Sequence, residues 1–353
     1  MDDIKDKLQI VFNHFIPGDQ ISITKITGGL IHVTYKVTRN NESYLLQKLN
    51  TLVFPKPEVV LSNIVKITTH LAKKPDYPYQ VVSPYKLIKG EGYLYRDETG
   101  AFWRLFPYLN GSVTYENTSD TELVFKAAYA FASFTSFLTE FNIMNLHPTI
   151  PHFHDPPHRW RQFEKAILKA IPHRKDGAAI LIRDLEINKS IFREFASLKL
   201  PTRIVHNDAK LNNILFKRNS KEALAIIDMD TVMPGTVLYD FGDMVRTMAT
   251  SFSEEHAQPH DISIQKDLFQ TIWVGYCHGL RDQLTPFERG NLFLGAAYII
   301  LEQSVRFMVD YLTGDKYYHV DYPDHNLNRA KNQFALFKSL VSRKDYLCTG
   351  LMK

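Results

Sequence analysis

The stretch from Ile204 to Asp243 constrains the fold of this chain most, because it reads IVHNDAKLNNILFKRNSKEALAIIDMDTVMPGTVLYDFGD. An apolar pair at 204–205 precedes a polar segment, and an apolar run at 223–227 follows it. Short apolar runs bounded by polar residues are typical of strands, so the polar side chains are expected at strand ends or in the connecting loop. The pattern predicts a hairpin that gathers three polar side chains, those of Asp208, Asn213 and Asp228.

These three residue types at this spacing indicate phosphoryl transfer. Asp208 can accept a proton from a hydroxyl group, and Asn213 can bind a divalent ion from the same loop. Asp228 is expected close to Asn213 across the hairpin, which completes a magnesium site, and Lys210 is expected to contact the transferred phosphoryl group. A base and a metal clamp suffice, because phosphoryl transfer needs mainly positioning and charge neutralisation. Alternatively, each Asp or Asn side chain could cap a turn.

The order of these parts is that of protein kinases, in which an H-R-D-L-x-x-x-N loop precedes D-F-G. Here Asp228, Met229 and Asp230 stand in place of D-F-G, and no A-P-E element follows, so a protein substrate is not expected. The length of 353 residues, with 44% hydrophobic residues, favours two lobes over one compact unit.

Composition excludes several partners. The 42 basic and 38 acidic residues are mixed along the chain without a long basic tract, so nucleic acid binding is not expected. The N-terminus lacks a signal core and no run approaches a membrane span in length, which predicts no membrane partner and a cytoplasmic location. Cys277 and Cys348 are expected to be reduced thiols. The expected assembly is a monomer or weak homodimer.

The N-terminal part predicts a small sheet that binds a nucleotide. An amphipathic helix over Lys5–Phe15 precedes strands between Ile21 and Asn50. Gly28 and Gly29 follow the first strand, where the absence of side chains would let backbone amides approach ATP phosphates. A plain tight turn explains the same two glycines without a ligand.

The third strand leaves two positions open for the lysine that contacts ATP phosphates in kinases. By analogy with V-A-I-K, YLL is followed by Gln47, whereas Lys48 carries the charge but lies on the opposite strand face. A helix over Val59–Leu71 follows, and Glu58 at its start could pair with a lysine or complement the helix dipole.

The segment RLFPYLNG predicts the connection between two lobes, because its proline and glycine interrupt a strand. Backbone groups of Phe106 and Tyr108 are expected to read the edge of an adenine, although a strand end rich in aromatic residues is the alternative. The expected division is a nucleotide-binding lobe at 1–106, a hinge at 107–111 and a helical catalytic and substrate lobe at 112–353.

The chain resembles the aminoglycoside phosphotransferase and choline kinase superfamily at IVHNDAKLNNILF and AIIDMDTVMPGTVLYDFGD. Further segments, including YLLQKLN, PHFHDPPHR and RFMVDYLTGDKYY, are similar to its N-acetylhexosamine 1-kinase branch. The resemblance implies a protein-kinase-like α+β fold, with a small antiparallel sheet followed by a mostly helical lobe. It also implies transfer of phosphate from ATP, with Mg²⁺, to the anomeric hydroxyl of N-acetylglucosamine or N-acetylgalactosamine.

The same resemblance implies roles for individual residues. It makes Asp208 the base, Lys210 a phosphate contact, and Asn213 and Asp228 the Mg²⁺ ligands. For the sugar it suggests four contacts, which are His32, Asp230, Arg306 and Tyr317.

Two of these sugar contacts have structural alternatives. Arg306 could instead pair with Glu302 on a helix surface, and Tyr317 could be a loop aromatic that only packs.

The cluster His152, His154, Asp155 and His158 invites a zinc interpretation, because histidine is a common metal ligand. Prolines interrupt the cluster and no H-E-x-x-H is present, so a turn held by side-chain hydrogen bonds is favoured. For the whole chain, the alternatives are a kinase of another small alcohol, such as an aminoglycoside, choline or homoserine, and a nucleotide-binding pseudokinase.

Overall fold

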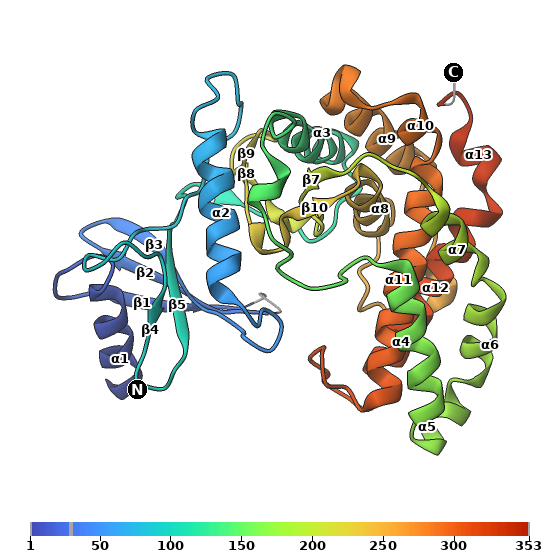
Figure 1. Cartoon of the computed structure of the whole chain (residues 1–353), viewed down its shortest axis with the longest axis horizontal. Coiled ribbons are helices and arrows are strands. Elements are labelled where there is room, and N and C mark those ends of the chain that lie inside the picture. Colours follow the sequence, from blue (N-terminus) through green and yellow to red (C-terminus); the bar gives the residue numbers. More distant parts are fainter. Residues whose placement is uncertain (1, 28–30, 352–353) are drawn as a thin grey trace.

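The computed structural model describes residues 2–27 and 31–351, and it joins an antiparallel sheet to a mostly helical region (Figure 1). Gly28 and Gly29 lie outside the described residues. The sheet has the order β1-β2-β3-β5-β4 with antiparallel neighbours. Its strands are β1 (Ser22–Ile26), β2 (Val33–Arg39), β3 (Glu42–Lys48), β4 (Tyr95–Arg96) and β5 (Phe102–Pro107). The predicted α+β class is confirmed.

Helix α1 (Asp2–Asn13) covers one face of this sheet and forms a small separate core with it. Its apolar residues recur at three- and four-residue spacing, which places one stripe of the helix on the sheet. The core includes Leu8, Val11, Phe12, Val37, Leu46, Trp103 and Leu105.

Helix α2 (Pro57–Leu71) belongs to the larger core of the helical region and stands between the sheet and that region (Figure 1). The fully buried Asn63 holds it there. The Asn63 amide nitrogen donates to the carbonyls of His147 and Val232 at 2.8 and 3.1 Å, and its oxygen accepts from the His147 N–H at 3.2 Å. These bonds satisfy the buried amide and fix α2 to the helical region.

The helical region packs around α11 (Leu292–Thr313), which contacts α4, α7, α8 and α12. The other helices are α3 (Thr121–Phe137), α4 (Pro156–Lys169), α5 (Pro172–Gly177), α6 (Ala179–Ile187), α7 (Ser190–Ser197), α8 (Val237–Met248), α9 (Lys266–Leu280), α10 (Pro286–Gly290), α12 (His325–Ser342) and α13 (Lys344–Cys348). The strands in this region are β6 (Ser112–Val113), β7 (Arg203–Val205), β8 (Ile214–Lys217), β9 (Ala223–Ile226) and β10 (Met233–Gly235).

Helix α11 is long and apolar enough to cross a membrane by length and composition, so the prediction that no run approaches that length was wrong. In the fold, 83% of its most apolar window is buried. Its apolar surface is therefore explained by its place at the centre of the helical region.

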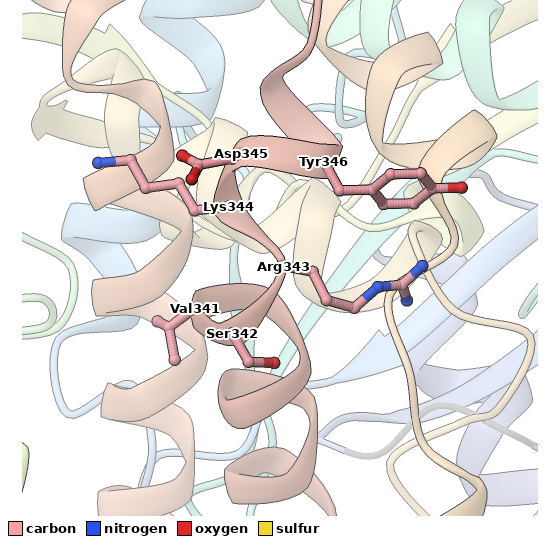
Figure 2. A pocket seen from close by; sticks show the side chains of 6 residues that line it. All are labelled: Val341, Ser342, Arg343, Lys344, Asp345 and Tyr346. Atoms are coloured by element: carbon pink, nitrogen blue, oxygen red, sulfur yellow. The ribbon is translucent and has the colours of Figure 1, made fainter.

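The last helices leave a surface depression of 560 Å³ at the turn between α12 and α13. Figure 2 shows Arg343 and Tyr346 extending to one side of this turn, and Lys344 and Asp345 to the other. The Arg343 guanidinium lies 5.1 Å from the Tyr346 ring centroid and donates to the Ile264 carbonyl at 2.6 Å. These contacts indicate a structural role for the turn.

The crossing of α8 and α11 depends on Gly242, and we expect Gly242→Ala to destabilise the fold. A β-carbon at this position would lie 2.6 Å from Ile299 Cγ1 and 2.7 Å from the Gly295 carbonyl oxygen. Overpacking of this kind costs about 1–3 kcal/mol of unfolding free energy. Chemical denaturation measures the loss, with Gly290→Ala as the control, because a β-carbon there meets nothing within 4 Å. Equal stability of the two variants would contradict the prediction.

Candidate active site

The catalytic hairpin differs in pairing from the expected one. Strand β7 pairs with β10, and β9 pairs with β8, a strand formed inside the segment predicted to be a polar turn. The Ile227 N–H donates to the Asn213 carbonyl at 3.0 Å, which brings the start of β8 beside the end of β9. Asp228, the residue after Ile227, therefore lies beside Asn213.

Asp208 lies in the loop between β7 and β8 and is bonded on both sides. The Lys210 ammonium is 2.9 Å from Asp208 Oδ2, and the Asn213 amide nitrogen donates to the same oxygen at 2.9 Å. Burial alone would raise the pKa of Asp208, but Lys210 and Asn213 outweigh it and hold this pKa below its ordinary value. The side chain is therefore an ionised carboxylate at neutral pH, as a proton acceptor must be.

Asp228 follows β9 beside Asn213 and has a left-handed backbone conformation, with φ 59° and ψ 51°. Burial, and then the neighbouring carboxylates of Asp230 and Asp208, raise its pKa. Because the Asn213 amide nitrogen donates to Asp208, the amide oxygen is the atom left for another partner. An oxygen donor set with surplus negative charge fits Mg²⁺, which would relieve the repulsion at Asp228.

Asp240 holds the backbone of the catalytic loop, a role that sequence reasoning missed. Thr236 caps α8, and Asp240 is fully buried within that helix. Its carboxylate accepts the N–H of His206 at 2.9 Å and that of Asn207 at 2.7 Å. These bonds fix the two residues that precede Asp208.

A cavity of 560 Å³ lies between the sheet and the hairpin. Its walls include the predicted residues Gln47, Phe106, Tyr108, Lys210, Asn213, Asp228 and Asp230, and also Thr34, Arg104, Pro107 and Leu109. The structure therefore brings the predicted metal ligands and nucleotide contacts to one cleft, with two exceptions. Lys48 is not among the described lining residues, and Gly28 and Gly29 are not described.

The register of β5 corrects one expectation about this cleft. The Tyr108 N–H donates to the Ser43 carbonyl at 3.1 Å, and Phe106 lies opposite Leu45 in β3. Alternate residues of an antiparallel strand bond to the same neighbour, so the backbone groups of Phe106 and Tyr108 point to β3. They are therefore already engaged, and the groups left to read an adenine edge belong to Pro107 and Leu109.

Arg104, on β5, lies directly beside Gln47, one of the two β3 positions at which a phosphate-binding lysine was sought. Gln47 lies directly opposite Arg104, and its oxygen accepts from Arg104 Nε at 3.0 Å. The guanidinium, only 2% exposed, donates to both oxygens of Asp230 at 2.6 and 2.9 Å. Lys48 lies opposite Trp103, on the other strand face. Arg104 was missed because only the strand register reveals its position beside Gln47.

His32 and Asp230, both predicted sugar contacts, are bonded to each other at 2.7 Å. The Asn50 N–H donates to His32 Nδ1 at 3.1 Å, so the proton of the neutral ring is on Nε2 and is donated to Asp230. Both ring nitrogens of His32 are therefore engaged. Burial would raise the pKa of Asp230, but Arg104 and His32 hold it far below its ordinary value.

The remaining predicted sugar contacts lie on α11 and the loop that follows it. Arg306 donates to the Gln303 side chain at 3.0 Å and packs over Phe153, with its guanidinium 5.0 Å from the ring centroid. Among the described contacts, Glu302 pairs with His154 and Arg159 rather than with Arg306. Tyr317 is 45% exposed.

The histidine cluster is held by side-chain hydrogen bonds. His152 bonds to Asp155 at 2.9 Å, and Asp155 caps α4 by accepting the His158 N–H at 2.9 Å. In residues 2–27 and 31–351, no group of three or more His, Cys, Asp and Glu side chains is placed to hold a metal.

Comparison with known proteins identifies what this arrangement is similar to. A model of the phosphotransferase enzyme family matches residues 22–268. Three similar solved structures are an aminoglycoside phosphotransferase from Alicyclobacillus acidocaldarius, a microcompartment-associated aminopropanol kinase, and a spectinomycin phosphotransferase in complex with ADP and spectinomycin. Their TM-scores are 0.62, 0.59 and 0.59 at 13%, 14% and 12% identity. The matches cover 96%, 99% and 96% of this chain and 96%, 99% and 97% of the other. The protein-kinase-like fold is therefore shown.

Proposed function

Because this chain belongs to the phosphotransferase enzyme family and is a small-molecule kinase, we propose that it transfers phosphate from ATP to the anomeric hydroxyl of N-acetylglucosamine or N-acetylgalactosamine. The observation that carries the kinase chemistry is the contact of Asp208 with both Lys210 and Asn213, which line one cleft together with Asp228. The hexosamine acceptor is supported by the sequence resemblance and by the charge balance of the residues on and beside α8 and α11, which we take as the acceptor side.

The proposed mechanism assigns one task to each group. Asp208, ionised because of Lys210, accepts the proton of the attacking hydroxyl, and Lys210 contacts the transferred phosphoryl group. Asn213 and Asp228 would hold Mg²⁺, which neutralises phosphate charge when bound. Residues 1–106 would form the nucleotide-binding lobe, 107–111 the hinge, and 112–353 the catalytic and substrate lobe.

The backbone of the connecting segment supports the nucleotide assignment. Pro107 offers a carbonyl and Leu109 an N–H, both beside the cavity and both pointing away from β3. An adenine edge presents one donor and one acceptor, so it matches this pair. The apolar side chains of Leu45, Ile226 and Leu215 would cover its faces.

The acceptor side favours a neutral molecule over a cation such as an aminoalcohol. Its carboxylates pair with arginines, since Asp243 and Glu254 both pair with Arg246, and Glu302 pairs with Arg159. Arg306 adds a further positive charge. A site for choline or an aminoglycoside would need surplus negative charge, whereas hydroxyl and acetamido groups need only hydrogen-bond partners.

A panel of free sugars and aminoalcohols tests the proposal. Incubation with ATP and Mg²⁺, followed by phosphorus NMR, should show an anomeric phosphate with N-acetylhexosamines and none with choline or aminopropanol. A phosphate at another position, or on an aminoalcohol only, would overturn the sugar assignment. If no member of the panel is phosphorylated although ADP binds, the hexosamine assignment is overturned.

A further inference from the structure

We propose that Arg104 is the cation that binds the β-phosphate of the nucleotide, in place of the lysine that kinases carry on the third strand. This inference rests on the proposed use of ATP, but it does not depend on the acceptor. Arg104 lies on β5, one strand away from the usual position.

The first argument is the charge of the cavity wall. Among the described residues that line the cleft, Arg104 and Lys210 are the two cations. Lys210 lies against Asp208, at the end of the cleft where the hydroxyl would be phosphorylated. The phosphates of a nucleotide need further positive charge along their length, and Arg104 supplies it on the opposite wall.

The second argument is the register between β3 and β5. Gln47 occupies the position of the kinase lysine and lies directly opposite Arg104, so both side chains project from the same sheet face. The Gln47 amide bridges Thr34 at 3.2 Å and Arg104 at 3.0 Å. A neutral residue at the lysine position thus orients a cation from the neighbouring strand.

The third argument is the ion pair that Arg104 makes. A kinase lysine is held by a glutamate of the helix after the third strand, but Glu58 of α2 is exposed and forms no ion pair in the part of the chain that is described. Asp230 takes that place and binds Arg104 through both oxygens. The guanidinium has five N–H groups, of which these bonds and the one to Gln47 use three. The remaining two are available to phosphate oxygens.

Calorimetric titration with ADP and with adenosine, without any acceptor, tests the assignment. Arg104→Met should weaken ADP binding roughly 10- to 100-fold, because it removes charged hydrogen bonds to phosphate, and should leave adenosine binding unchanged. Gln47→Lys added to Arg104→Met should restore ADP binding, since it returns a cation to the ordinary position. Lys48→Ala, on the other strand face, is the matched control and should bind ADP normally.

A purely structural role would give a different pattern. Arg104→Met with Asp230→Asn removes both charges, so no buried carboxylate is left unpaired, and it should show the same selective loss of ADP binding. Equal weakening of ADP and adenosine, or unchanged ADP binding, would overturn the proposal. Wild-type protein that binds ADP but phosphorylates no sugar would refute the acceptor assignment alone.

Discussion

Asp208→Asn should lower kcat by about 100- to 10,000-fold, the range that a general base contributes. The asparagine side chain has the same size, so Lys210 and Asn213 keep a neighbouring oxygen, but the amide cannot take the proton of the attacking hydroxyl. Because the pKa of Asp208 is held low by Lys210, the wild-type carboxylate is already ionised at neutral pH and ready to accept the proton. The lower kcat of the variant would therefore report the loss of this proton acceptor. A coupled assay of ADP release with saturating sugar and ATP measures it.

Two comparisons isolate this effect. The variant should bind ADP as the wild type does, because Asp208 is not among the residues that line the nucleotide cavity. Asp184→Asn, a partly exposed carboxylate beside Arg183 on α6, should keep full activity. Near-normal turnover of Asp208→Asn at saturating substrates would show that the base is assigned wrongly.

The sequence predicted the α+β class and the gathering of the polar residues because both depend on local patterns. Hydrophobic periodicity defined the strands and α1, and a short loop necessarily keeps Asp208 near Asn213. The catalytic segment was readable because its residues lie close together in the chain.

The misjudged features depend on contacts between distant segments. Arg104 and Asp230 are 126 positions apart, and Asn63 joins α2 to Val232 across 169 positions. No periodicity reports such pairs. The bonding direction of β5 likewise depends on its register with β3, which the spacing of prolines and glycines does not determine.

Asp240→Asn should lower kcat by roughly 100-fold, although Asp240 itself is not expected to contact the substrate. The reason is that a small displacement of the catalytic Asp208 costs about this much in rate. The carboxylate accepts two backbone N–H groups of the catalytic loop, and an asparagine has one oxygen to offer them. One of the two N–H groups then faces an amide nitrogen and the loop before Asp208 shifts. Steady-state kinetics should show the loss in kcat, with ADP binding unchanged.

The matched control is Asp97→Asn, another buried carboxylate that accepts backbone N–H bonds, from Thr99 at 2.9 Å and Ala101 at 3.0 Å. It lies in the hairpin between β4 and β5, away from the catalytic loop. The Asp97→Asn variant should be less stable than the wild type but should keep the wild-type kcat. If both variants lose kcat equally, Asp240 acts only through general stability.

The pH dependence of stability tests the raised pKa of Asp240. Burial raises its pKa from 3.8 to about 6, so between these values the folded state binds a proton that the unfolded state has released. Its contribution to stability is therefore greatest below pH 4, falls by roughly 3 kcal/mol as the pH rises to about 6, and is constant above. Asp240→Asn lacks this titration, so the stability of the wild type relative to the variant should decrease from pH 4 to pH 6. Urea denaturation at several pH values measures the difference, and a pH-independent difference would contradict the raised pKa.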